Sequence, residues 1–267
     1  MTDMMDDFDL PREKNTDKDR KFVESLARGL DVLRAFSQKG GVLGNQDIAK
    51  ITGLPKPTVS RMTYTLMELG YLTFSTQLEK YQLDAGVLAL GYAYTSNLQV
   101  RRIAKPIMES LANRVNLSVG LTICERISML YVENCRGDDS QALRMEVGSS
   151  LPVATSAAGR AYLAGLSAAE REIMLVRLEK RAGDRWDELK AGVDDALAEY
   201  DEHGFCTSIG AWDKSINGVG VPLRLQNGRV LALNCGGPAY LVSPEMAKES
   251  LGPQLVHVAR DIIATGV

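Results

Sequence analysis

The stretch GLPKPTVSR, residues 53–61, decides the fold of the first part of the chain. Proline restricts the residue before it to extended backbone, so we expect Lys56 to be the N-cap of a helix that begins at Pro57. At the first helical position the missing N–H of proline costs nothing, and its fixed φ already suits the helix. Pro55 stiffens the turn before this start. The two prolines therefore set where a helix begins instead of breaking one.

Helical spacing gives the segment after Pro57 two faces. The apolar face is expected to pack on the preceding helices; it contains Val59, Met62, Leu66 and Leu69. The opposite face contains Pro57, Ser60, Arg61, Tyr64 and Glu68. Hydroxyls, a guanidinium and a phenol near a helix N-terminus are groups that a recognition helix offers to base edges and phosphates in the major groove. A solvated helix in a helical hairpin would show the same two faces.

The neighbouring segments favour the DNA-binding interpretation. A first helix is indicated by apolar residues at helical spacing, which are Leu26, Leu30, Leu33 and Phe36. A second, short helix lies in NQDIAKI, residues 45–51, and two strands at 71–74 and 80–83 flank a polar turn. Three helices and a hairpin within residues 21–85 predict a winged helix-turn-helix. The expected DNA-binding residues are Lys56, Pro57, Thr58, Ser60, Arg61, Tyr64 and Lys80.

The rest of the chain predicts a second domain. Residues 1–20 are polar and aperiodic and are expected to be a disordered tail, and residues 86–99 are expected to be a linker helix. Strands are expected at 117–123, 127–135, 141–147, 216–225 and 229–235, and helices at 101–115, 156–165, 168–181, 187–203 and 244–263. Hairpin-linked strands with helices between them indicate an α+β domain with an antiparallel sheet over residues 100–267.

Composition and inventory exclude several classes of protein. The formal net charge is −3, but the only charges between Ile48 and Met67 are Lys50, Lys56 and Arg61, a local basic face that suits DNA. The four cysteines form no CxxC pair, and the two histidines have no nearby second ligand, so no metal or cofactor is expected. No paired-carboxylate, G-x-S-x-G or P-loop motif is present, and we expect no enzyme. An acidic N-terminus and the lack of a membrane-length apolar run predict a cytoplasmic protein.

The sequence resembles the IclR family of bacterial transcriptional regulators over about residues 22–265. The N-terminal motifs that carry the resemblance are SLARGLDVLRAF (25–36), IAKITGLPKPTVSRMTYTLMELGYL (48–72) and KYQLDAGVLALG (80–91). In the second half they are GSSLPVATSAAGRAYLA (148–164) and GRVLALNCGGPAYLVSPE (228–245). The resemblance implies a winged helix-turn-helix, a linker helix and a GAF-like effector-binding domain. It also implies a homodimer, or a dimer of dimers, on a near-palindromic operator in double-stranded DNA.

The chain departs from the family pattern in two places. Pro57 stands where relatives usually have serine or threonine. In the effector domain, Asn217 and Gly218 replace an arginine–cysteine pair, and Asn234 and Gly236 replace two serines. Ile209, Gly210 and Ala211 stand where acidic residues are common. Effector identities therefore do not transfer from relatives.

The segment VATSAAG, residues 153–159, is the candidate anchor for an effector. Free N–H groups at a helix start, with a hydroxyl cap, can bind an anion, so we expect a carboxylate there. Ser156 would equally serve as a plain helix cap with small residues packing behind it, and Trp212 is either a pocket wall or a packing residue. The missing side chains at Gly218, Gly220 and Gly236 suggest either room for an acid larger than pyruvate or tight backbone contact. The expected effector-binding residues are Thr155, Ser156, Ala157, Ala158, Trp212, Asp213, Asn217, Asn234 and Gly236.

These observations predict a DNA-binding regulator controlled by a small organic acid, with a catabolic operon as its target. The alternative is a thiol-based redox sensor that uses Cys124, Cys135, Cys206 or Cys235. Their apolar strand settings, such as LTIC and LALNC, favour inert core thiols.

Overall fold

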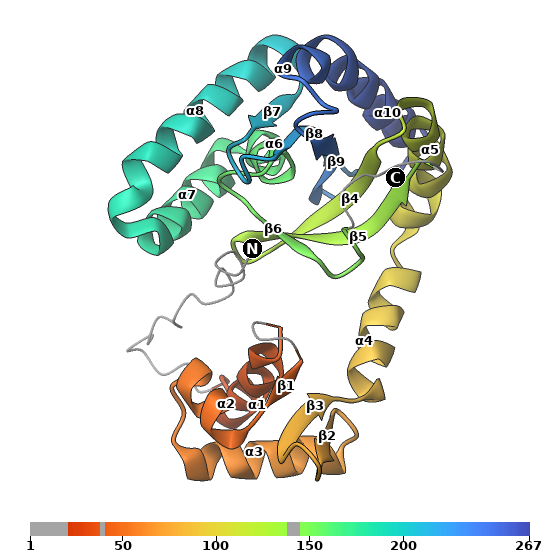
Figure 1. Ribbon diagram of the computed structural model, residues 1–267. Coiled ribbons are helices and arrows are strands. Elements are labelled where there is room, and N and C mark those ends of the chain that lie inside the picture. The colour runs from red at the N-terminus through yellow and green to blue at the C-terminus, as the bar shows by residue number, and fades with distance from the viewer. Residues whose placement is uncertain (1–20, 38–40, 138–144) are drawn as a thin grey trace. The chain divides into compact units, whose positions relative to one another are not determined.

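The computed structural model describes residues 21–37, 41–137 and 145–267, and the expected tail at 1–20 lies outside them (Figure 1). The chain divides into two compact units, Met1–Asn97 and Leu98–Val267. Both mix helices and antiparallel strands, which confirms the α+β class. Among the helices that the structure describes, none is both long and apolar enough to cross a membrane.

The first unit is a small helical core with a three-stranded sheet. Its elements are α1 (Glu24–Ala35), β1 (Val42–Leu43), α2 (Asn45–Thr52), α3 (Lys56–Glu68), β2 (Leu72–Ser75), β3 (Lys80–Leu83) and α4 (Ala85–Ser96). The strand order is β1-β3-β2, all antiparallel. Val32, Phe36, Ile48 and Val59 are among the buried residues that join the helices to the strands. This is the expected winged helix-turn-helix with one extra, two-residue strand.

Helix α3 begins one residue earlier than the sequence predicts. Pro55 is the N-cap, with φ −60° and ψ 141°, so Lys56 is the first helical residue and Pro57 the second. Pro55 also accepts hydrogen bonds from the N–H groups of Thr58 (2.9 Å) and Val59 (3.0 Å). The prediction of Lys56 as N-cap is therefore wrong. The reason is that the first four N–H groups of a helix have no intrahelical acceptor, so proline loses nothing at the second position either.

Three leucines of the apolar pattern in α1 and α3 lie at the surface. Leu26 and Leu30 of α1 are exposed, as is Leu69, which directly follows α3. Helix α1 instead buries Ala27, Val32 and Ala35. The prediction that Leu69 packs on the inner face was wrong, because helical spacing identifies an apolar stripe and not which part of the stripe faces this core. For Leu26 and Leu30 the spacing predicted a helix, which is present.

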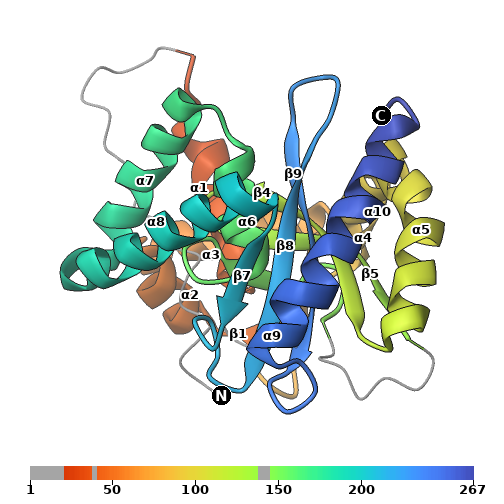
Figure 2. The same cartoon turned by 90° about the horizontal axis from the view of Figure 1, so that it is seen from above.

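The second unit is a six-stranded antiparallel sheet with helices on both faces. Its elements are α5 (Gln99–Val115), β4 (Ser118–Glu125), β5 (Ser128–Arg136), β6 (Ser150–Pro152), α6 (Ala157–Gly165), α7 (Ala168–Ala182), η2 (Gly183–Arg185), α8 (Trp186–His203), β7 (Cys206–Ile209), β8 (Ile216–Arg224), β9 (Val230–Pro238), α9 (Pro244–Met246), η3 (Ala247–Leu251) and α10 (Gly252–Ala264). The strand order is β6-β5-β4-β9-β8-β7. Figure 2 shows α5 and α10 on one side of this sheet and α6, α7 and α8 on the other.

Period-two alternation along the strands separates the two faces. On β9, Leu231, Leu233 and Cys235 join the large core under α5 and α10. Asn234 and Gly236, between and after them, are among the residues that line a cavity on the α6 side. One face of the sheet is therefore a dry core, and the other carries polar and small residues.

Two predictions for this unit need correction. The strand expected at 141–147 is not a strand at 145–147, and its remainder lies outside the described residues; the edge strand is β6, Ser150–Pro152. The expected helix 244–263 is present but passes through a π-helical segment, Ala247–Leu251. Strand β7, four residues long, was not predicted, although Gly204 before it and Gly210 after it, both with positive φ, were the available turn signals.

Candidate functional site

The outer face of α3 presents the side chains that the sequence assigned to DNA. Lys56, Pro57, Ser60, Arg61 and Tyr64 are exposed, and Thr58 and Lys80 are half-buried. Behind this face, Val59 and Leu66 are buried and fix the helix on the core. Gly53, with φ +68°, ends α2 and makes the tight turn into Pro55. The turn and its caps thus hold the α3 N-terminus at the surface.

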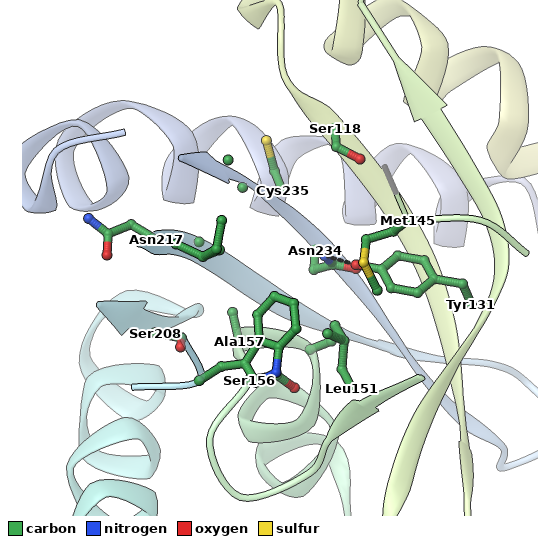
Figure 3. Close-up of a pocket in the computed structure, with 16 residues that line it drawn as sticks. Ser118, Tyr131, Met145, Leu151, Ser156, Ala157, Ser208, Asn217, Asn234 and Cys235 are labelled. Atoms are coloured by element: carbon green, nitrogen blue, oxygen red, sulfur yellow. Dashed lines mark hydrogen bonds between the residues drawn. The ribbon is translucent and has the colours of Figure 1, made fainter. Parts of the chain in front are cut away.

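A cavity lies between the start of α6 and the sheet of the second unit (Figure 3). Its free volume is about 40 Å³, enough for only one to three water molecules. The lining residues are Ser118, Tyr131, Met145, Leu151, Ser156, Ala157, Ala158, Ser208, Trp212, Ile216, Asn217, Gly218, Asn234, Cys235, Gly236 and Gly237. None of these carries a formal charge. Any charge on a ligand must therefore be met by hydroxyls, amides and backbone N–H groups.

The N-terminus of α6 supplies two free backbone donors to this cavity. Ser156 is the N-cap; its Oγ accepts a hydrogen bond from the Gly159 N–H (3.1 Å) and donates to the Pro152 carbonyl (2.6 Å). Ser156 therefore does cap the helix, as the plainer interpretation held. The N–H groups of Ala157 and Ala158 have no acceptor among the described residues. Two adjacent N–H groups at the positive end of a helix dipole attract an anion.

Arg160 ties this helix to the neighbouring strand. Its Nη1 donates to the Thr207 carbonyl at 2.9 Å, and its Nε donates to the Ala154 carbonyl at 3.3 Å. Ser208 adds a second tie, because its hydroxyl donates to the Thr155 carbonyl at 2.7 Å. The start of α6 is therefore held in place before any ligand arrives.

Asn217 lines the cavity, but both ends of its amide are already engaged. Its Oδ1 accepts from the Gly210 N–H (2.9 Å), and its Nδ2 donates to the Val242 carbonyl (2.8 Å). Trp212, on the loop that follows Gly210, also lines the cavity and is half-buried. Asn217 thus fixes the loop that presents Trp212 as a wall.

Two residues that the sequence assigned to the effector do not line the cavity. Thr155 contributes only its carbonyl, to Ser208. Asp213 accepts from the N–H and the hydroxyl of Ser215 at 2.8 and 2.6 Å, and these bonds lower the pKa of its carboxyl. Asp213 therefore stabilises a local turn. The residue types at both positions suited a ligand, but the turn geometry uses them locally.

The glycines on the sheet reflect close backbone packing and not extra room. A Cβ on Gly236 would lie 2.7 Å from the Asn217 carbonyl oxygen, and one on Gly220 would collide with the Ala157 carbonyl. A Cβ on Gly120 would collide with the Tyr131 ring. The sequence left two interpretations of these glycines, extra room or tight backbone contact, and the structure supports tight contact. The glycines therefore do not indicate a large effector.

Tyr131 is the main lining residue that sequence reasoning missed. A β-bulge at Val132 interrupts the β4–β5 pairing, in which Leu121 pairs with Glu133 and Thr122 with Tyr131. Arg101 holds this bulge: its Nε donates to the Val132 carbonyl at 2.9 Å. The Tyr131 hydroxyl accepts from Asn234 Nδ2 at 2.8 Å. A glycine inside a strand pattern, Gly120, was the available signal for a large neighbour.

The four cysteines are unsuited to redox sensing. Burial raises the pKa of Cys124 to about 11 and the pKa values of Cys135, Cys206 and Cys235 to about 12. All four are free thiols. Because the thiolate is the reactive species, these groups are inert near neutral pH. The described residues also contain no cluster of three or more His, Cys, Asp or Glu that could hold a metal ion.

Two family descriptions match this chain and together cover most of it. The IclR helix-turn-helix domain matches residues 25–75, and the bacterial transcriptional regulator IclR C-terminal domain matches residues 92–264. This chain belongs to the IclR family. It is therefore a DNA-binding transcriptional regulator of the helix-turn-helix type and not an enzyme, and the resemblance seen in the sequence is confirmed.

Other IclR-type proteins are similar to this chain in sequence or in fold. The HTH-type transcriptional regulator TsaQ1/TsaQ2 of Comamonas testosteroni is 34% identical over 245 residues, which cover 91% of this chain and 88% of that protein. The crystal structure of an IclR family transcriptional regulator from Brucella abortus has a TM-score of 0.88 at 41% identity, covering 96% of this chain and 97% of that one. An IclR homologue from Microbacterium hydrocarbonoxydans, solved in complex with 4-hydroxybenzoate, has a TM-score of 0.69 at 24% identity, covering 90% and 99%.

Proposed function

We propose that this regulator binds its operator through the outer face of α3 and changes its affinity when a small carboxylic acid occupies the α6 cavity. The observation that carries the second part is the pair of free N–H groups at Ala157 and Ala158 inside a cavity without charged side chains. A carboxylate is the simplest anion with two oxygens for two adjacent donors. The IclR homologue bound to 4-hydroxybenzoate supports an acid as ligand of this fold.

On α3 we assign contacts by chemistry and position. Arg61, exposed in the second turn, carries the planar guanidinium that pairs with guanine edges. Lys56, at the first helical residue, is placed for a phosphate, together with Lys80 on the wing strand β3. Ser60 and Tyr64 add hydroxyl contacts, and Pro57 supplies shape without a donor.

We also propose that a second copy of the chain covers α4. Residues 85–96 include no charged side chain, yet the helix buries no residue within the described chain. Leu88 is 75% exposed and Tyr92 71%. A helix that is apolar on all sides is normally buried. Because α4 has no charged side chain, it offers no ion pairs to a partner with a charged surface, whereas a second α4 matches it. A two-fold pair of such helices would yield a homodimer that matches a near-palindromic operator.

The acid hypothesis is tested by thermal-shift screening of the full-length protein against acetate, glycolate, propanoate, pyruvate, benzoate and 4-hydroxybenzoate. We expect at least one acid to raise the melting temperature, and the corresponding neutral amide to leave it unchanged. Stabilisation by the amide to the same degree would contradict an anion site at α6. A genomic neighbourhood that encodes enzymes for the stabilising acid would fit control of a catabolic operon, and the protein would act in the cytoplasm, where the DNA is.

The redox alternative requires a thiolate that the structure does not favour. With pKa values near 11 to 12, less than about one thiol in a thousand would be ionised at pH 7. We therefore infer that hydrogen peroxide at signalling concentrations leaves operator binding unchanged.

A further inference from the structure

The sheet side of the cavity holds two polar groups that the chain itself leaves unpaired. The Asn234 Oδ1 is buried and has no hydrogen-bond partner. The Tyr131 hydroxyl accepts from Asn234 Nδ2 at 2.8 Å, and its own hydrogen has no acceptor among the described residues. In Figure 3 the two side chains converge from β5 and β9, away from Ser156 and Ala157 at the start of α6. A second recognition point thus lies apart from the carboxylate anchor.

Unpaired polar groups on a cavity wall indicate a ligand that pairs with them, because a buried donor or acceptor without a partner costs free energy of folding. Tyr131 is only 3% exposed, and burial raises its pKa to about 12, so the phenol stays protonated and remains a donor. Asn234 Oδ1 remains an acceptor. Rotating the Asn234 amide by 180° only exchanges the roles: Tyr131 then donates to Oδ1, and Nδ2 becomes the unpaired group. In both arrangements the pair offers one donor and one acceptor site.

We propose that the effector is a hydroxy acid whose alcohol or phenol hydroxyl binds Tyr131 and Asn234 while its carboxylate binds the α6 N-terminus. A hydroxyl both donates and accepts, so it satisfies either arrangement of the pair. It is also the smallest group that does so, and the cavity has only about 40 Å³ of free space. This inference rests on the proposed acid site and adds the identity of the group at the other end.

Two other ligand ends fit less well. A second carboxylate has no hydrogen to give to the acceptor that the pair presents in either arrangement, and no lysine, arginine or histidine lines the cavity to balance its charge. A plain hydrocarbon end would leave the buried acceptor and the phenol unpaired. Sites built to bond a ligand hydroxyl reject analogues that lack it, because their own polar groups then stay unsatisfied.

The test is calorimetric titration of the full-length protein with matched acids. The pairs are glycolate with acetate and 3-hydroxypropanoate with propanoate, whose few heavy atoms suit a cavity of about 40 Å³, and 4-hydroxybenzoate with benzoate, which bind only if the cavity widens. Succinate and terephthalate are the diacids. We expect the hydroxy acid of at least one pair to bind roughly tenfold or more tightly than its parent acid. Tyr131→Phe and Asn234→Ala should each reduce that preference to less than about threefold.

Tyr162→Phe is the matched control. Tyr162 lies on α6 itself but does not line the cavity, and its hydroxyl lies beside Cys124. This variant should keep the full hydroxyl preference. Equal loss of the preference in Tyr162→Phe and Tyr131→Phe would overturn the assignment, since it would show a general effect on the domain.

The outcomes separate this inference from the proposed acid site. Parent acids that bind as tightly as hydroxy acids, or diacids that bind more tightly, would overturn the hydroxyl assignment and leave the carboxylate anchor standing. Absence of binding by every acid would overturn both. A hydroxyl preference that survives in Tyr131→Phe and in Asn234→Ala would show that another group reads the hydroxyl, and would also contradict the proposal.

Discussion

The substitution Ala157→Pro removes one anchor donor from the α6 cavity with little change to the helix. Ala157 is the first helical residue, where proline is well tolerated. Proline also requires extended backbone in the residue before it, and Ser156 already has φ −80° and ψ 151°. The Ala157 N–H makes no hydrogen bond among the described residues, so replacing it with proline removes none from the folded protein. We expect the free energy of unfolding to change by less than about 1 kcal/mol.

The effect on acid binding should be much larger. A hydrogen bond to a charged group contributes about 1.5–3 kcal/mol, so losing one donor should weaken the acid roughly 10- to 100-fold. Calorimetric titration with the tightest-binding acid gives the dissociation constant, and urea denaturation gives the stability. Ala157→Val serves as the control, because it adds comparable bulk and keeps the N–H. If Ala157→Pro bound the acid as tightly as wild type, or if Ala157→Val weakened it equally, the anion site would not lie at this N–H.

Four further predictions concern DNA binding, assembly and the thiols. Arg61→Ala should cost roughly 1–3 kcal/mol of operator affinity while sparing non-specific DNA, as measured by fluorescence anisotropy; equal loss on both DNAs would indicate a phosphate contact instead. Pro57→Ser should change the operator-binding profile while shifting stability by less than about 1 kcal/mol, and an unchanged profile would contradict its position in the groove. Leu88→Glu should convert a dimer into a monomer in light scattering, and a monomeric wild type would rule out the covering copy. Burial raises the pKa of Cys235 from 9.0 to about 12, so between these pH values the native thiol keeps its proton and the unfolded thiol loses it. The free energy of unfolding should therefore fall above pH 9, by up to about 1.4 kcal/mol per pH unit per thiol. Cys235→Ala should make this slope shallower in urea denaturation.

Helix α3 was predictable because its signals are local. Two prolines, a glycine turn and a two-faced pattern occupy fewer than about twenty consecutive residues. The error of one residue at Lys56 has an equally local cause, since the unpaired N–H groups of the first helical turn tolerate proline at more than one position. Leu26 and Leu30 show the limit of such patterns: an apolar stripe does not state whether the covering surface is the same chain or another one.

The cavity was only partly predictable because strand order creates it. The segment VATSAAG signals a capped helix start from seven residues alone. Tyr131 and Asn234, by contrast, are 103 positions apart in the sequence and meet only because β5 and β9 both flank β4. The bulge at Val132 further sets which residues pair across β4 and β5, and no residue type in ISMLYVENC announces it. Such pairings depend on non-local contacts, which composition and periodicity do not encode.

We propose that an acid in the α6 cavity controls DNA binding. The most direct measurement is fluorescence anisotropy of a labelled fragment from upstream of the protein's own gene, titrated with wild type or Ala157→Pro, with and without the tightest-binding acid. We predict that saturating acid changes the affinity of wild type for this fragment by at least about tenfold, and that the same acid concentration changes the affinity of Ala157→Pro far less. An acid that binds wild type but leaves its DNA affinity unchanged would contradict control of DNA binding by the α6 cavity.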